Sequence, residues 1–123
     1  MNSINNVLGE SLELCSCKPK TGYFRDGYCR TAGIDMGKHT ICAVMTEDFL
    51  TFTETCGNDL STPRLEFDFP GLKPGDRWCL CALRWKEAWL AGCAPLVVLE
   101  SCEESALESV PLEVLKMYAT TSE

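Results

Sequence analysis

GNDLSTPRLEFDFPGLKPGDRWCLCALRWKEAW, residues 57–89, contains the loop, strand and helix signals that decide the fold. Prolines and glycines interrupt residues 57–76, so we expect a long irregular loop there, of the kind that often serves as a binding loop or lid. The loop ends in Lys-Pro-Gly-Asp at residues 73–76, with proline and glycine at the central positions of a type II turn. Directly after the turn come two thiols one residue apart, Cys79 and Cys81. We therefore expect any chemistry of this chain to be concentrated here.

Short strands and helices are expected to alternate on both sides of the loop. The strands are expected at residues 39–46, 77–82 and 95–100, and the helices at residues 47–56, 83–91 and 102–109 and from Pro111 onward. Thr46 is placed to cap the first helix, and Ser101 with Glu104 forms a capping box for the third. Residues 6–30 are rich in turn signals, with a brief strand expected at residues 23–24.

This alternation predicts a single α+β domain over residues 1–123, with an ordered core at about 6–118. The domain is expected to contain a small mixed or antiparallel sheet, three to four short helices and long irregular loops. The chain has 123 residues, of which 46% are hydrophobic. At this size it can bury one core without cross-links.

The charge balance restricts the possible partners. The chain has 11 basic and 18 acidic side chains, which gives a net charge of −7, and its basic residues are scattered. Nucleic acids and anionic membranes need a cationic surface, so we expect neither as a partner. No window approaches the roughly 18 apolar residues of a membrane span. The first residues, MNSINNV, lack the features of a signal peptide, so we expect a cytoplasmic protein.

Cysteine is the residue type that most needs interpretation. The nine cysteines stand at positions 15, 17, 29, 42, 56, 79, 81, 93 and 102. Their number is odd and no export signal precedes them, so the sequence does not indicate a disulfide framework. A free cysteine is more often a small buried hydrophobe than a reactive group. We therefore expect most of the nine to be reduced thiols.

Cys79 and Cys81 are candidate ligands of a zinc-type metal ion. Two residues apart in a strand, they share one face and can chelate a soft metal, but they supply only half of a tetrahedral site. Cys29, His39 and Cys42 are the candidates that would complete it. His39 and Cys42 are three apart, so they face opposite sides of a regular strand and act together only if the chain bends there. Because C-x-x-C pairs are absent, buried strand thiols without metal are the alternative.

The same two thiols are candidate nucleophiles. Nucleophilic cysteines need an electropositive and partly open setting, and Arg77, Arg84 or His39 can supply the positive or basic group beside Cys79 or Cys81. The alternative is a central strand with both faces buried, in which the thiols only pack.

A binding module without catalysis is the third hypothesis. The loop after the first helix gathers amide, carboxylate, hydroxyl and guanidinium groups that can orient a small polar or anionic ligand: Asn58, Asp59, Ser61, Thr62 and Arg64. The alternative is that these side chains bond to their own backbone in an Asx-turn. Arg25 and Arg30 are further candidates for an anion, or they pair with the surplus carboxylates.

Six long blocks of the sequence carry a family resemblance. They are NVLGESLELCS, TGYFRDGYCRT, DMGKHTICAVMTEDFL, GNDLSTPR, FPGLKPGDRWCLCALRWKEA and AGCAPLVVLE. With these blocks the chain resembles, over residues 6–118, a family of small, mostly bacterial proteins, the domain-of-unknown-function family 2237. The resemblance implies a stand-alone single-domain protein without an established activity. Its blocks include Cys15, Cys29, His39, Cys42, Cys79 and Cys81. Glu103 stands where the resemblance leads us to expect a histidine, which disfavours any site that needs two histidines.

Overall fold

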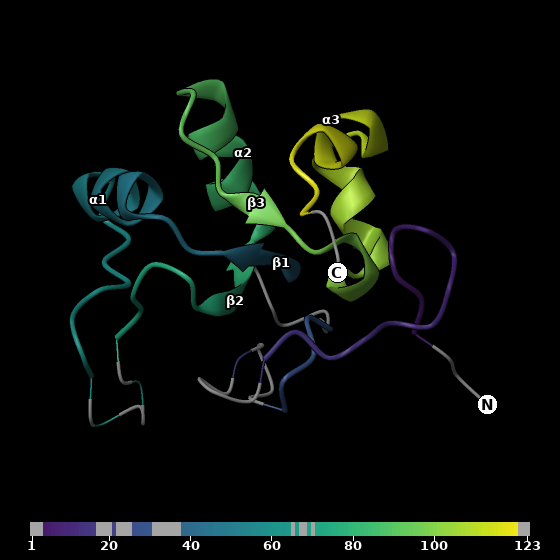
Figure 1. Ribbon diagram of the computed structural model, residues 1–123, viewed down its shortest axis with the longest axis horizontal. Helices are drawn as coiled ribbons and strands as arrows, with labels where there is room; N and C mark the ends of the chain where they lie inside the picture. The colour runs from purple at the N-terminus through teal and green to yellow at the C-terminus, as the bar shows by residue number, and fades with distance from the viewer. Residues whose placement is uncertain are drawn as a thin grey trace.

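The structure is a computed structural model that describes residues 4–16, 21, 26–30, 38–64, 66, 69 and 71–120. Its elements, in chain order, are β1 (His39–Val44), α1 (Glu47–Thr55), β2 (Arg77–Cys81), α2 (Ala82–Leu90), β3 (Leu96–Val97), the 3₁₀ helices η2 (Leu99–Ser101) and η3 (Glu104–Glu108), and α3 (Leu112–Met117). The three strands form one antiparallel sheet in the order β2-β1-β3 (Figure 1). This confirms the predicted α+β class.

Helix α1 begins where the sequence predicts. The hydroxyl of Thr46 accepts a hydrogen bond from the backbone N–H of Phe49 at 3.1 Å, which satisfies one of the donors left open at a helix start. Glu47 and Asp48 occupy the first turn, where carboxylates suit the helix dipole. Phe49 is fully buried and directs the apolar face of the helix into the core.

The turn that precedes β2 also follows the prediction. The N–H of Asp76 donates to the carbonyl of Lys73 at 3.0 Å, and Gly75 takes φ +95°, a value that favours glycine. The turn leads straight into β2, and α2 follows the strand without a loop. Gly92, also at positive φ, lies just beyond the end of α2.

The predictions for residues 95–109 are partly wrong. After β3, the N–H of Val98 donates to Cys42 and the N–H of Glu103 donates to Thr40, so the chain leaves β1 and returns to it. The 3₁₀ helix η2 lies between these two hydrogen bonds, where the sequence predicted the end of a strand. The prediction failed because an apolar run indicates burial but does not by itself fix the backbone as a strand. The predicted capping box is absent: Glu103 accepts from the N–H of Ser105 and caps η3 instead.

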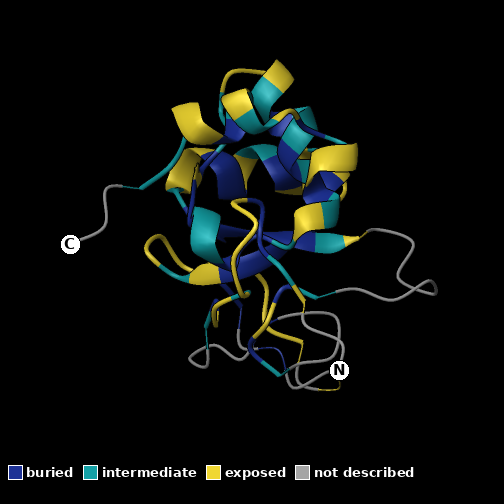
Figure 2. Ribbon diagram, turned by 90° about the vertical axis from the view of Figure 1, so that its right-hand side faces the viewer, coloured by how far each residue is buried: buried dark blue, intermediate teal, exposed yellow. Residues whose placement is uncertain are grey.

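The sheet is covered on both sides. The helices lie on one side, and the N-terminal chain, drawn in purple and blue in Figure 1, lies on the other. Strands β1 and β2 lie within a largely buried region (Figure 2). On the helical side, Trp85 is fully buried, donates its indole N–H to the carbonyl of Pro95 at 3.0 Å and meets Tyr118 edge to face. Trp85 is therefore a core residue.

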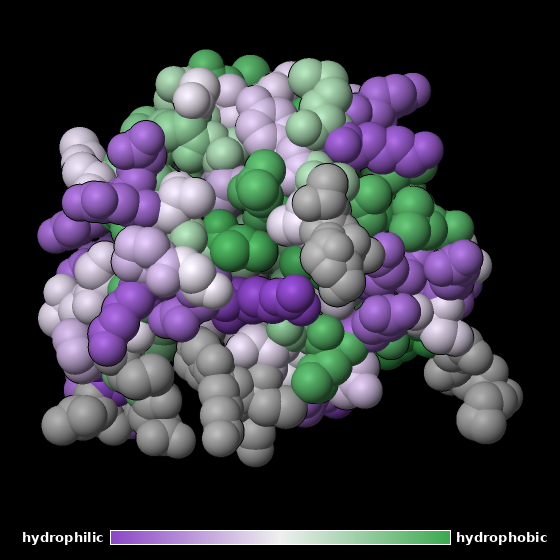
Figure 3. All heavy atoms as spheres, in the orientation of Figure 1, coloured by the Kyte–Doolittle hydropathy of each residue, from purple (hydrophilic) through white to green (hydrophobic). Residues whose placement is uncertain are grey.

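The outer surface is mixed in character. Figure 3 shows hydrophobic and hydrophilic residues interspersed over the face seen in Figure 1. Among the described residues, the large apolar ones with more than half of their surface exposed are Leu83, Leu90 and Met117. They lie on two separate helices, α2 and α3.

We call the described residues 4–16, 21 and 26–30 the N-terminal segment. It contains no named helix or strand in its described part, and the brief strand predicted at residues 23–24 lies outside the described residues. The segment is held by hydrogen bonds to distant backbone, among them Val7 N–H to Cys102 O at 2.9 Å and Glu13 N–H to Glu100 O at 3.0 Å. It therefore depends on the rest of the domain for its shape.

Candidate functional site

The register of β1 and β2 brings two predicted cysteines together. Cys42 lies opposite Cys79 in the antiparallel pair, and both are buried. Opposed residues of such a pair have their side chains on the same face of the sheet. Two sulfurs from different strands therefore meet on the face covered by the N-terminal segment.

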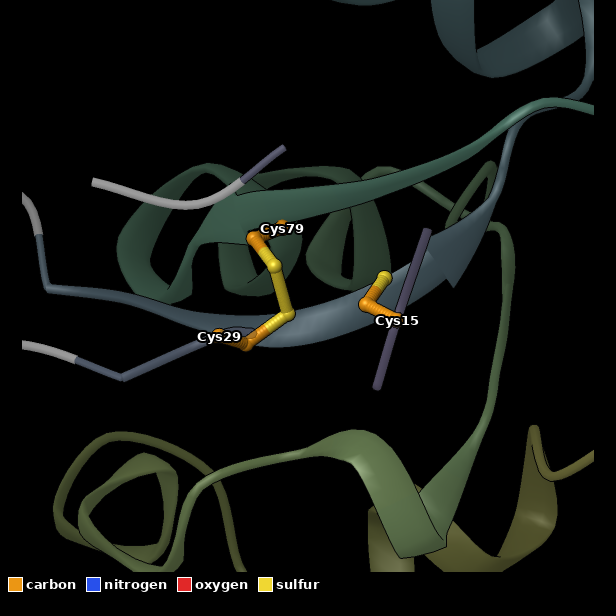
Figure 4. A group of neighbouring side chains, drawn as sticks. All are labelled: Cys15, Cys29 and Cys79. Atoms are coloured by element: carbon orange, nitrogen blue, oxygen red, sulfur yellow. A yellow bond between two sulfur atoms is a disulfide. The ribbon is translucent and has the colours of Figure 1, made fainter. Parts of the chain in front are cut away.

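The N-terminal segment adds two more sulfurs. Cys15 forms a disulfide with Cys42 and Cys29 forms one with Cys79, with Cα–Cα distances of 5.8 and 5.2 Å. Figure 4 shows Cys15 beside the Cys29–Cys79 disulfide. The sulfurs of Cys15, Cys29 and Cys79 all lie within 4.8 Å of one another. We call Cys15, Cys29, Cys42 and Cys79 the four-cysteine cluster.

The expectation of mostly reduced thiols is wrong for these four residues. The bonded pairs are 27 and 50 residues apart in the chain, so spacing alone could not reveal them. Cys79 is bonded to Cys29 and not held together with Cys81, the partner that the strand pattern favoured. Tertiary contact decides the pairing here, because the N-terminal segment lies against the sheet face that carries Cys42 and Cys79.

Hydrogen bonds of the backbone at Cys15 and Cys79 hold the cluster in place. Thr21 is fully buried, and its hydroxyl accepts a hydrogen bond from the N–H of Cys79 at 2.8 Å. The carbonyl of Thr21 accepts from Gly27, whose own carbonyl accepts from Cys15. Gly27 has φ +91°, and a Cβ there would lie 2.9 Å from the carbonyl oxygen of Ser16. Only glycine fits this position without rearrangement.

A β-bulge places His39 opposite Cys81. The register shifts between His39 and Ile41, so that His39 lies opposite Cys81 while Cys42 stays opposite Cys79. The extra residue provides the bend that the sequence alone left open, because bulges re-aim side chains along a strand. His39 and Cys81 are half-buried, and Cys81 is a free thiol at the residue before α2.

The chain's family is shown by comparison with known proteins. The family model described as "Uncharacterized protein conserved in bacteria (DUF2237)" matches residues 5–119. The chain belongs to this family. No curated protein matches the chain. Among the described residues, no helix has the length and apolar character that a membrane span requires.

In this family member, the predicted ligand loop makes local hydrogen bonds. The side-chain amide of Asn58 donates to the hydroxyl of Thr53 in α1 at 3.0 Å. The carboxylate of Asp59 accepts from the N–H groups of Ser61 and Thr62, as in an Asx-turn. Hydrogen bonds from Thr62 and Ser61 lower the pKa of Asp59. The side chains of Asn58 and Asp59 therefore shape the loop itself.

The predicted arginines occupy different surroundings. Arg30 forms an ion pair with Asp26, with Nε and Oδ2 2.7 Å apart. Pairing with a carboxylate was the alternative to anion binding for this residue. Burial raises the pKa of Asp26, but the hydrogen bonds from Arg30 and the Tyr28 N–H, together with the charge of Arg30, outweigh it and hold that pKa below its usual value. Arg64 and Arg77 are exposed. Arg25 lies outside the described residues.

Two further observations concern Cys102 and Cys15. Cys102 is a free thiol, but burial raises its pKa to about 12 and its Sγ donates to the carbonyl of Val98 at 3.3 Å, so it is an inert core group. Cys15 is the cluster member that sequence reasoning left out of its candidate ligands. Its place in a family block was the one signal that pointed to it. The four-cysteine cluster can form disulfides, and three of its sulfurs, those of Cys15, Cys29 and Cys79, also lie close enough together to hold a metal ion.

Proposed function

We propose that the protein is a metal-binding module in which the reduced four-cysteine cluster holds one Zn²⁺ ion. The observation that supports this is the convergence of sulfurs: three lie within 4.8 Å of one another, and the fourth, Cys42, is bonded to Cys15. A tetrahedral zinc ion with Zn–S bonds near 2.3 Å places its sulfurs about 3.8 Å apart. The sulfurs of Cys15, Cys29 and Cys79 already lie within 4.8 Å of one another, and Cys42 would join them once its bond to Cys15 is reduced.

The ligand set favours a structural zinc site. Four thiolates suit zinc or iron, and four protein ligands leave no open position for a substrate. All four cysteines are at most 3% exposed, so water has little access to the centre. Zinc bound here would join the N-terminal segment to β1 and β2, as the disulfides do.

The disulfides and the metal are alternative states of the same sulfurs. A dithiol reductant transfers two electrons and two protons to each disulfide, so two equivalents convert the cluster into four thiols while the reductant forms its own disulfides. Zinc then binds the thiolates, and the thiol protons pass to solvent. Exchange with two equivalents of an oxidised dithiol reverses both steps: the oxidant takes up the four electrons and is reduced to thiols with protons from solvent, the two disulfides re-form, and the ion is released.

Native mass spectrometry of the reduced protein with zinc added tests this proposal. We expect one zinc per wild-type chain, and loss of that zinc in the Cys42→Ser and Cys79→Ser variants. Cys56→Ser is the matched control, because Cys56 is a free, half-buried thiol outside the cluster. A folded, fully reduced wild-type protein that retains no zinc overturns the proposal.

A thiol-dependent site at Cys81 is a second candidate function. The observation in its favour is that Cys81 is free, half-buried, placed at the start of α2 and opposite His39. A thiol beside an imidazole at a helix N-terminus is a setting typical of cysteine nucleophiles. In this hypothesis a small polar or anionic ligand is bound with help from the exposed guanidinium groups of Arg64 and Arg77.

Alkylation by iodoacetamide tests the second candidate. Cys81 should react at least about tenfold faster than Cys56, which is half-buried and free but has no histidine opposite it in a strand pair. The His39→Gln variant should lose this difference. Equal rates for Cys81 and Cys56 in the wild-type protein would exclude an activated thiol.

A further inference from the structure

The N-terminal segment is attached to the domain in two different ways. Its first section, residues 4–14, is held by hydrogen bonds that involve no sulfur. Besides the bonds of Val7 and Glu13, the N–H of Glu104 donates to the carbonyl of Asn5, and the hydroxyl of Ser101 donates to the carbonyl of Leu14. These bonds lead to residues 100–104, at one end of the domain.

The second section, residues 15–16, 21 and 26–30, is attached through the cluster. Its ties to the sheet include the two disulfides and the hydrogen bond between Cys79 N–H and Thr21. Its own backbone bonds, Cys15 N–H to Gly27 O and Gly27 N–H to Thr21 O, join the section to itself. The described part of this section contains no named helix or strand, so these few bonds depend on its attachment to the sheet and open when the sulfur ties open.

We infer that the four-cysteine cluster is a redox-controlled clasp for this second section. Two disulfides close the clasp in the oxidised protein, and zinc closes it in the reduced protein. Reduced, metal-free sulfurs leave it open, so the second section separates from β1 and β2 while residues 4–14 remain bound. The inference rests on the proposed function for one of its two closed states.

Opening of the reduced, metal-free clasp follows from the interactions that are lost and those that remain. Four neutral thiols pack as hydrophobes but supply no bond across the interface. Loss of both disulfides removes closures of loops with sequence separations of 27 and 50. Each disulfide lowers the conformational entropy of the open state. Once the disulfides are reduced, the open state regains this entropy, which favours opening. The sheet itself has its own strand pairing and helical cover, so opening is confined to the second section.

Amide hydrogen exchange in three states tests the clasp: oxidised, reduced with zinc, and reduced with a chelator. The reporters for the second section are the amides of Cys15 and Gly27, and those for the first section are the amides of Val7 and Glu13. We expect exchange at Cys15 and Gly27 to be on the order of 100-fold faster in the third state than in the first. The amides of Val7 and Glu13 should change less than about threefold.

Two results overturn the inference. One is equal protection of Gly27 in the oxidised and the reduced, metal-free protein. The other is equal loss of protection at Val7, which would show that the whole domain opens rather than one section. If zinc fails to bind, the proposed function fails, but the comparison of the oxidised with the reduced, metal-free protein still decides whether sulfur bonds act as a clasp.

A double variant tests the clasp without the addition of a reductant. Cys29→Ser with Cys79→Ser cannot close its second tie under any condition, so Gly27 should exchange fast even in oxidised protein. Cys56→Ser is the control and should match the wild type in all three states. Slow exchange at Gly27 in the oxidised double variant would contradict the inference.

Discussion

Residues 38–120 form the sheet and its helical cover, and the N-terminal segment lies on the other side of that sheet, yet different interactions shape the two parts. Residues 38–120 contain every named helix and strand of the described chain, with caps, turns and an apolar core. The N-terminal segment bonds its backbone to distant carbonyls and is tied to the sheet by two disulfides. The comparison teaches that cysteine has two roles here, as a core hydrophobe such as Cys102 and as a tie between layers.

Because different interactions hold the two parts, we expect substitutions in them to have different effects on stability. Removal of core packing should unfold the domain, whereas removal of a sulfur tie should release one layer and leave the other folded. Substitutions that act on only one part therefore test the comparison, and they can be ordered by the size of the expected effect.

The largest effect is expected for Trp85→Ala on the helical side. The substitution removes a fully buried indole together with its hydrogen bond to Pro95 and its contact with Tyr118. We expect the free energy of unfolding to fall by about 3–5 kcal/mol, measured by denaturant titration. Trp89→Ala, at a half-buried position of the same helix, should cost clearly less. Equal costs for the two variants would contradict the placement of the core.

The next effect concerns the tie between Cys29 and Cys79. In oxidised protein, Cys29→Ser with Cys79→Ser removes a closure over a sequence separation of 50 and should lower the free energy of unfolding by about 2–4 kcal/mol. The near-ultraviolet circular dichroism of the tryptophans should be retained, because the helical layer stays folded. Loss of that signal would mean that the two parts are not separable.

Gly27→Ala should have a smaller effect on the same layer. Alanine must adopt φ +91° there, with its Cβ against the carbonyl of Ser16, so we expect a loss of about 1–3 kcal/mol in unfolding free energy. Gly57→Ala is the matched control, because Gly57 has the same φ of +91° and open space around it. Thermal unfolding of both variants separates the steric cost from the backbone cost. A Gly57→Ala variant that is less stable than Gly27→Ala would refute the close approach.

The smallest effect is the pH dependence of the Asp26–Arg30 pair. The pKa of Asp26 is lowered from 3.8 in the folded protein, so its ionised form stabilises the fold above pH 3.8, and this contribution is lost as pH falls through the lowered pKa. Asp26→Asn should therefore be slightly less stable than wild type at pH 6 and indistinguishable from it at pH 2. Urea titrations at both pH values measure the difference. A larger difference in stability at pH 2 than at pH 6 would contradict a lowered pKa of Asp26 in the folded protein.

Local signals in the sequence predict much of residues 38–120. The Thr46 cap and the turn with Gly75 depend on neighbours within three residues, and such interactions are visible in the sequence. The excursion between Val98 and Glu103 could not be predicted in this way. Its ends bond to β1, a strand more than 50 residues earlier in the chain.

The candidate site was predicted in part. Cys29, Cys42 and Cys79 were among the candidate ligands, and they do converge. The partnership of Cys15 depends on how the N-terminal segment crosses the sheet, and no local pattern encodes that path. The β-bulge at His39 was equally out of reach, because one extra residue in a strand leaves the apolar pattern almost unchanged.

X-ray absorption at the zinc edge, on reduced protein loaded with one equivalent of zinc, identifies the atoms that bind the ion. We expect four sulfur ligands at about 2.3 Å and no nitrogen or oxygen ligand. A shell that contains nitrogen from His39, the chain's only histidine, or oxygen from water would contradict a closed site made by the four-cysteine cluster.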